Sequence, residues 1–156
     1  MEEKVIKISE IHSFKIQPIN KMEGKNGSRL GMAQMINALG GYGEYDGYKI
    51  ETDKNTHYVL IENGQSCCES WGYITSNDNL DDYIGKILKE IVLTDTALDK
   101  KKVEDLYCED NQIQFVDFKF TDGEVLQLAV YNSHNGYYGH SIVVGNEKEV
   151  LLTEVL

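Results

Sequence analysis

Two short turn sequences divide the stretch from Gln112 to Val144 into three runs that are typical of β-strands. The first turn contains Asp122-Gly123 and the second contains Asn135-Gly136. Both dipeptides favour a tight hairpin, because the two central residues of a type I′ turn need positive φ angles. The β-branched and aromatic residues around them therefore predict a three-stranded antiparallel meander as the central sheet of the domain. Its strands are expected at Gln112–Phe120, Val125–Asn132 and Tyr138–Val144.

The clearest helical pattern lies nearer the N-terminus. Apolar residues recur at helical spacing from Leu30 to Leu39 and stop at Gly40-Gly41, a pair that favours a helix C-cap. A further hairpin is predicted from Tyr48–Thr52 and His57–Ile61. Strands joined by hairpins, with one main helix, predict an α+β fold in which the Leu30–Leu39 helix packs on one face of a predominantly antiparallel sheet.

The remaining segments are predicted to extend this sheet. Residues 79–92 have a helical period that passes into β-branched residues, which predicts a short helix followed by a strand. Residues 95–110 are highly charged and predict a solvated connection before the meander. Further strands are expected at Val5–Ile8, Phe14–Ile16, Cys67–Thr75 and, as an edge strand, Glu149–Leu156.

The length of the chain predicts one domain. With 156 residues it can bury a single core, so residues 1–156 are expected to fold together, the first 29 as a strand and loop region. The N-terminus lacks the basic and apolar segments of a signal peptide, and no run of about 18 apolar residues is present. Cys67, Cys68 and Cys108 are odd in number, which favours reduced thiols. These features predict a cytoplasmic protein with no membrane partner.

Charge narrows the range of partners. The net charge is −11, the acidic excess lies after residue 29, and Arg29 is the single arginine. Such a surface repels nucleic acid and attracts a basic protein, since the summed field of a protein steers association. Arginine is the side chain that best binds phosphate through two parallel hydrogen bonds, and this chain has only one arginine. Direct binding of phosphate is therefore disfavoured. The alternative explanation is that an acidic surface keeps a small protein soluble.

A tyrosine-rich segment follows the predicted helix and is a candidate contact surface. Tyrosine alternates there with glycine and acidic residues, and rigid aromatic side chains provide contact area at low entropic cost. The alternative is a wide turn whose tyrosines lie on the sheet. The candidate binding residues are Tyr42, Glu44, Tyr45, Asp46 and Tyr48.

The turn between the second and third predicted strands is a candidate ligand cradle. Its glycines, Gly136 and Gly139, would allow backbone amides to approach a small molecule, while tyrosine rings stack on it. Turn chemistry alone also explains the glycines. The candidate binding residues are His134, Asn135, Tyr137, Tyr138, His140 and Ser141.

The vicinal cysteines Cys67-Cys68 raise two chemical alternatives. A thiol nucleophile would need His134 or His140 as a base within hydrogen-bonding reach. A zinc site from the same four residues is disfavoured, because adjacent cysteines lack the two-residue gap that lets both thiolates face one metal. Small cysteines buried on a strand are the ordinary explanation. We therefore expect no catalytic residue, no metal and no cofactor.

Three motifs give the chain a family resemblance. They are Cys67-Cys68-Glu69, Asp81-Asp82-Tyr83-Ile84-Gly85 and the hairpin segment from Ser133 to Tyr138. Over residues 49–144 the chain resembles an uncharacterised small domain family of phages and bacterial mobile elements. It departs from the family pattern at His134 and at Gly139-His140. The resemblance implies no reaction, because the family has no assigned activity, but it implies a phage-like origin.

Small acidic phage proteins are often inhibitors of host defence, and this association sets the functional expectation. We predict a phage-type, anti-CRISPR-like inhibitor whose acidic surface engages the basic nucleic-acid-binding groove of a host effector protein. One alternative is a sponge, a protein that binds and sequesters a small nucleotide signal. Its site would be Asn135–Ser141, at the interface of a homodimer. Lys148 or Arg29 would have to lie near this site to offset the repulsion between the acidic protein and an anionic ligand. A structural accessory domain without a catalytic role is another alternative.

Overall fold

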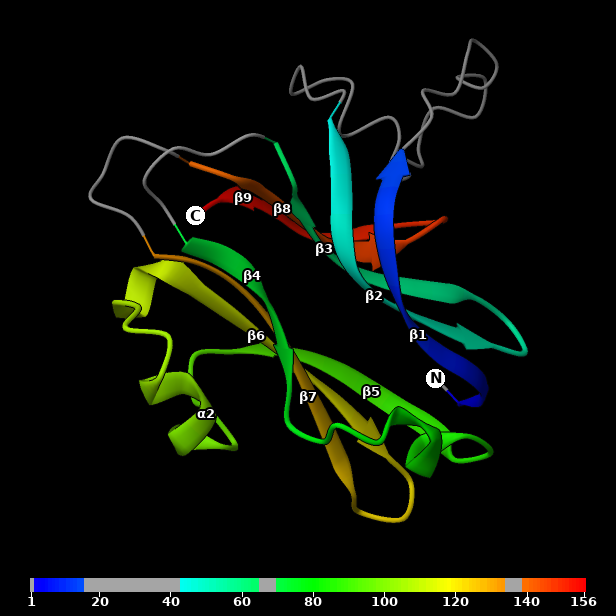
Figure 1. Ribbon diagram of the computed structural model, residues 1–156. Coiled ribbons are helices and arrows are strands. Elements are labelled where there is room, and N and C mark those ends of the chain that lie inside the picture. The colour runs from blue at the N-terminus through cyan, green and yellow to red at the C-terminus, as the bar shows by residue number, and fades with distance from the viewer. Residues whose placement is uncertain (1, 16–42, 65–69, 134–138) are drawn as a thin grey trace, which may run out of the picture.

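The computed structural model describes residues 2–15, 43–64, 70–133 and 139–156, and their strands form one antiparallel sheet (Figure 1). The strand order in the sheet is β4-β7-β6-β5-β1-β2-β3-β8-β9. Three short helical segments accompany it, at Leu80–Tyr83 (η2), Lys100–Glu104 (α2) and Asp110–Gln112 (η3). The strands are β1 Glu3–Lys15, β2 Glu44–Thr52, β3 Thr56–Glu62, β4 Ser70–Thr75, β5 Ile87–Thr94, β6 Ile113–Phe120, β7 Val125–Ser133, β8 Ser141–Asn146 and β9 Val150–Val155.

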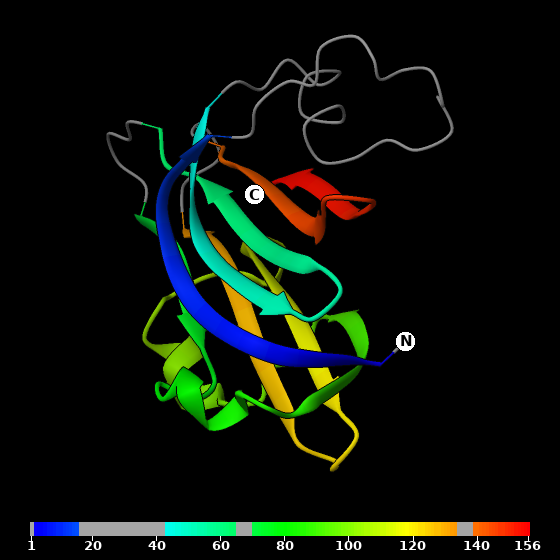
Figure 2. The ribbon, with the colours of Figure 1, turned by 90° about the vertical axis from the view of Figure 1, so that its right-hand side faces the viewer.

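The sheet folds over on itself, so that two half-sheets enclose the core. The first half-sheet is β4-β7-β6-β5 and the second is β1-β2-β3-β8-β9. They join where the start of β1 pairs with β5 at Glu3 and Lys4. Figure 2 shows β1 in a long curve across the side of the molecule, and two register shifts along β1 allow this bend. The core combines inward-facing side chains of both half-sheets, among them Val5, Ile50, Ile61, Leu88, Val116, Phe118, Leu126, Leu128 and Ile142.

The predicted α+β class is wrong, because the described structure is nearly all antiparallel sheet. Its longest helix, α2, has five residues. The Leu30–Leu39 segment lies outside the described residues. The physical reason for the error is that segments assigned to loops are strands: β2 begins at Glu44 and β1 runs unbroken to Lys15. The prediction of an antiparallel sheet is confirmed, since every strand pairing is antiparallel.

The predicted meander is correct in its first hairpin and wrong in its third strand. β6 and β7 pair around Asp122-Gly123, where Gly123 has a φ of 89°. β8, however, pairs with β3 and β9 instead of β7. Its run Ile142–Val144 is buried on both faces, because Ile142 and Val144 pack in the main core while Val143 packs in a small cluster with Tyr45 and Leu60 on the other face. A turn dipeptide cannot specify which distant strand pairs with β8.

Several other predictions are confirmed. The β2–β3 hairpin forms, η2 leads into β5, and β9 is an edge strand of the sheet. Residues 95–110 were predicted to be a solvated connection, but part of this segment is hydrogen-bonded to the sheet. The Gln127 side chain accepts a hydrogen bond from the Leu98 amide and donates one to the Thr96 carbonyl, which ties this segment to β7. None of the helices in the described part of the chain has the length and apolar character needed to cross a lipid bilayer.

Candidate functional site

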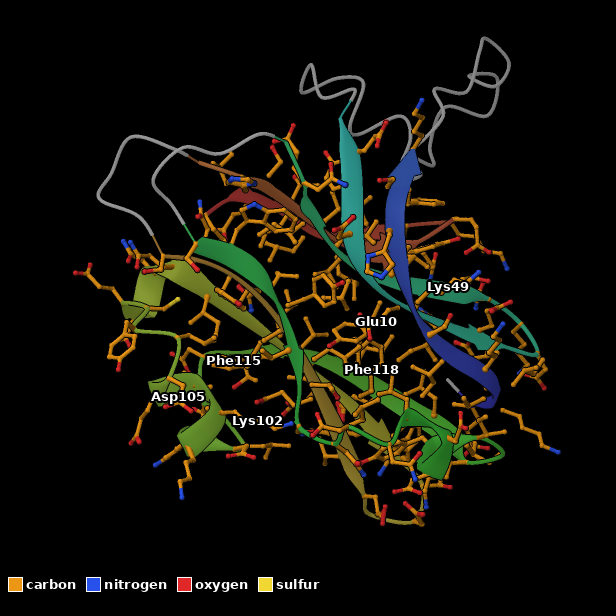
Figure 3. The ribbon with its side chains drawn as sticks, in the orientation of Figure 1. Glu10, Lys49, Lys102, Asp105, Phe115 and Phe118 are labelled. Atoms are coloured by element: carbon orange, nitrogen blue, oxygen red, sulfur yellow. The ribbon has the colours of Figure 1, made fainter. Side chains whose placement is uncertain are left out.

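A groove with acidic walls opens where β1 and β2 approach β4 and α2. Its volume is about 490 Å³. Glu10 enters from β1, and Lys102 and Asp105 enter from α2 and the residue that caps it (Figure 3). We call this site the acidic groove. Its lining residues are Glu10, Tyr48, Tyr73, Ile74, Thr75, Asp78, Leu80, Lys102 and Asp105.

Two tyrosine rings form the base of the acidic groove. Tyr48 of β2 and Tyr73 of β4 meet edge to face, with 5.2 Å between ring centroids. Tyr48 is only 4% exposed. The Tyr73 hydroxyl lies 3.3 Å from Nδ1 of His12. The groove therefore combines aromatic surface with two phenol hydroxyls.

The electrostatic environment of the acidic groove is negative. Burial raises the pKa of both tyrosine hydroxyls, and nearby Glu10 raises both further. The groove has one cation, Lys102, but its Nζ already donates to the Thr75 carbonyl at 2.7 Å and to Asp78 Oδ1 at 2.8 Å. Glu10 and Asp105 thus remain to attract a positive ligand. An anionic ligand such as a phosphate would be repelled.

The titration of Tyr73 tests this account of the groove. Burial and the hydrogen bond and charge of Glu10 raise the pKa of Tyr73 to about 12. We expect Glu10→Gln to lower the pKa of Tyr73, because a neutral amide stabilises the phenol less than a carboxylate does. NMR of tyrosine labelled at ¹³Cζ measures each ring separately. Glu62→Gln is the control, since Glu62 raises the pKa of Tyr45 and should leave Tyr73 unaffected. An unchanged Tyr73 titration in Glu10→Gln would contradict the assignment.

The predicted tyrosine loop is a strand, and most of its candidate residues have structural roles. Tyr42 lies outside the described residues. Glu44 pairs with Lys15 at 3.7 Å, and Tyr45 is 1% exposed in a small core cluster. Tyr48 alone among these candidates lines the acidic groove. Asp46 accepts hydrogen bonds from the Ser13 amide and from Asn63.

Gly47 explains why this segment resembled a loop. Its φ is 151°, and a Cβ at this position would lie 2.1 Å from the Val59 carbonyl oxygen. The glycine is needed because β2 and β3 approach closely in an otherwise regular strand pair. Tyr45 and Tyr48 are buried in the sheet, and the binding role of this segment stays a prediction.

The predicted ligand cradle is described only at its end. His134, Asn135, Tyr137 and Tyr138 lie outside the described residues, as do Cys67 and Cys68. His140 is buried: its ring stacks on Trp71 at 5.4 Å and its Nδ1 donates to the Glu62 carbonyl at 2.6 Å. Its backbone exchanges two hydrogen bonds with Leu156, and Ser141 begins β8. These contacts hold the C-terminal strand in place, and the nucleotide-sponge hypothesis stays a prediction.

Sequence reasoning missed most of the acidic groove. Glu10, Tyr73, Asp78, Lys102 and Asp105 come from separate segments that the fold brings together. No spacing in the sequence links them, so no local pattern could have identified the site. Within the described ranges, no cluster of His, Cys, Asp and Glu side chains is arranged to hold a metal ion.

Comparison with known proteins places the chain in a family. A sequence profile described as "Domain of unknown function (DUF7448)" matches residues 4–144. The chain belongs to this family. An uncharacterised protein of Acanthamoeba polyphaga mimivirus is 32% identical over 97 residues, which cover 61% of this chain and 74% of the viral protein. No solved structure matches. The expectation of an uncharacterised family is confirmed, whereas its attribution to phages and mobile elements remains a proposal.

Proposed function

We propose that this DUF7448 protein is a virus-encoded inhibitor that binds a host defence effector and performs no catalysis. Its target would be a protein with a basic nucleic-acid-binding surface, such as a CRISPR nuclease. The observation that carries the proposal is the acidic groove, which Glu10 and Asp105 line together with two tyrosine rings, while Asp78 is paired with Lys102. The mimivirus relative supports a viral origin.

The groove suits a lysine or arginine side chain of the target. A cation placed over the Tyr73 ring would gain a cation–π attraction and lie near Glu10 and Asp105. The Tyr48 hydroxyl at the base could accept a hydrogen bond from its N–H groups. The net charge of −11 would accelerate the encounter with a basic surface. Occupation of that surface would exclude nucleic acid from it.

A pull-down from host lysate, followed by a nuclease assay of the captured protein, tests this function. We expect capture of a nucleic-acid-binding protein, loss of its nuclease activity, and weaker binding as salt is raised from about 0.05 to 0.5 M, because salt screens exposed charges. The double variant Glu10→Lys/Asp105→Lys should reduce capture roughly tenfold or more, since it replaces attraction with repulsion at the groove.

The matched control is Asp95→Lys/Glu154→Lys, which changes the net charge equally at exposed positions outside the groove. It should bind nearly as well as the wild type. Equal losses for the two double variants would show that net charge alone drives binding, and the groove assignment would fail. Capture of proteins without a basic surface, or an uninhibited nuclease, would exclude the proposed inhibitor function.

A further inference from the structure

β4 is one of the two outermost strands of the sheet, so one of its sides has no neighbouring strand in the described part of the chain. We call this side the free edge of β4. The other side pairs with β7 in a regular register from Ser70 to Thr75. Every residue of β4 is uncharged, and the strand has neither a proline nor a bulge. Proteins usually protect an exposed edge with one of these features, because unpaired backbone groups attract another chain. The free edge of β4 is therefore unprotected.

A hydrogen bond at the end of β4 shows which backbone groups face the free edge. The Ser76 amide, directly after β4, donates to the Gln127 carbonyl of β7 at 2.9 Å. In an antiparallel pair, only every second residue of a strand bonds to the same neighbour. Counting back from Ser76, the N–H and C=O groups of Trp71 and Tyr73 point away from β7. These groups face the free edge.

A side chain from α2 occupies one end of the free edge. Lys102 Nζ donates a hydrogen bond to the Thr75 carbonyl at 2.7 Å. Thr75 lies two residues after Tyr73, so its carbonyl points to the same side of β4. The contact agrees with the alternation of the backbone groups, and it takes up the carbonyl at this end. A partner strand would therefore pair with Trp71 and Tyr73.

The acidic groove runs along the free edge, because its lining comes from both faces of β4. Successive side chains of a strand point to opposite faces. Tyr73 faces the second half-sheet, where its ring meets Tyr48. Ile74 faces α2, where it lines a small cavity together with Val103. Both Tyr73 and Ile74 line the acidic groove, so the groove passes around the edge that separates the two faces.

The free carboxylates of the groove lie on the two sides of this edge. Figure 3 shows Glu10 on one side of β4 and Asp105 on the other. A strand added to β4 would direct its side chains alternately toward Glu10 and toward Asp105. Two consecutive basic residues would each meet a carboxylate, whereas basic residues separated by one position would both point to the same face. The arrangement of charges thus indicates a dibasic segment.

We propose that the free edge of β4 binds an extended, dibasic segment of the target protein by strand addition. The backbone of the segment pairs with Trp71 and Tyr73, which supplies affinity. Its two consecutive lysine or arginine side chains extend to Glu10 and Asp105, which supply specificity. The proposal rests on the proposed inhibitor function, since it names the part of the target that the acidic groove accepts.

Two capped hexapeptides of identical composition test the spacing of the charges. Acetyl-Thr-Val-Lys-Lys-Val-Thr-amide has adjacent lysines, and acetyl-Thr-Lys-Val-Lys-Val-Thr-amide has a valine between them. NMR titration of the purified protein should show the first peptide binding roughly tenfold or more tightly, because it alone directs a lysine to each carboxylate. Equal affinities would show that net charge alone attracts the peptides, and the proposal would fail. It would also fail if the first peptide did not bind.

Backbone N-methylation of the first peptide tests the strand pairing. The N–H groups of alternate residues in an extended peptide point to the same side. Methylation at the second and fourth residues therefore blocks one side of the peptide, and methylation at the third and fifth residues blocks the other. Strand addition predicts that one methylated peptide loses binding and that the other retains it. Equal behaviour of the two methylated peptides would contradict strand addition.

Hydrogen exchange of the protein amides locates the bound peptide. Binding should slow the exchange of the Trp71 and Tyr73 amides roughly tenfold or more, because these groups gain carbonyl partners. The Gly72 and Ile74 amides, which point toward β7, should change little. Unaltered exchange at Trp71 and Tyr73 would place the peptide elsewhere. Protection of both amides without peptide, in a dimer that forms as protein concentration rises, would assign the edge to a second copy of the chain. Either result would overturn the proposal.

The double variants of the pull-down serve here as well. Glu10→Lys/Asp105→Lys should weaken binding of the first peptide roughly tenfold or more, and Asp95→Lys/Glu154→Lys should leave it nearly unchanged. The two proposals fail separately. A nuclease that is captured and inhibited, together with a peptide that does not bind the edge, would exclude strand addition alone. Binding of the peptide at the edge without inhibition of any captured nuclease would exclude the inhibitor function alone.

Discussion

Replacement of Leu128 by alanine should lower the free energy of unfolding by about 2–5 kcal/mol. Leu128 is fully buried in the middle of β7, where it faces the core shared by the two half-sheets. Its neighbours in the sheet are Val116 on β6 and Thr75 on β4. The substitution would leave a cavity in the core. Because strands on both sides hold the backbone of Leu128, the sheet cannot shift to fill this cavity. Urea denaturation followed by circular dichroism measures the loss.

Leu98→Ala is the matched control for this prediction. Leu98 is 53% exposed, and its contact with β7 is made by its backbone amide, which the substitution retains. Its expected effect is within about 0.5 kcal/mol. Similar losses at the two positions would mean that the core is not concentrated between the half-sheets as described.

The sequence predicts those parts of the fold that neighbouring residues determine. The β2–β3 and β6–β7 hairpins were predictable, because each turn lies between the two strands that it joins. The pairing of β8 with β3 was not, because Ile61 and Ile142 are far apart in the chain and no local signal connects them. Long-range pairing depends on which apolar surfaces meet in the complete core.

The same distinction applies to the candidate sites. Composition predicted an acidic surface, and that property requires no knowledge of residue positions. The acidic groove itself depends on the convergence of β1, β2, β4 and α2. The contact between Glu3 and His57 could not be predicted from the sequence either. Glu3 stands between charged residues, Glu2 and Lys4, and such a segment is usually exposed to solvent. Its burial follows from the pairing of β1 with β5.

Removal of the Glu3 carboxylate by Glu3→Ala should destabilise the protein by about 3–5 kcal/mol, because loss of one partner leaves the other buried polar groups unpaired. Thr52, Asn55 and His57 all bond to Glu3 Oε1. Glu2→Ala provides the control at the adjacent, exposed position and should change stability by no more than about 0.5 kcal/mol. Urea denaturation at pH 7 compares the two variants.

Glu3→Gln removes the charge of this carboxylate but keeps the volume of the side chain. The pH dependence of the free energy of unfolding then shows how much the charge contributes. The pKa of Glu3 is lower in the folded protein than its usual value of 4.5, so the unfolded chain binds the proton more readily. The stabilisation is therefore fully present above pH 4.5 and is lost as the pH falls through the folded pKa. The wild type should exceed Glu3→Gln in stability at pH 7, and the difference should shrink below about pH 4.5. A difference that stays constant from pH 7 to pH 3 would mean that the ionised carboxylate does not hold the cluster.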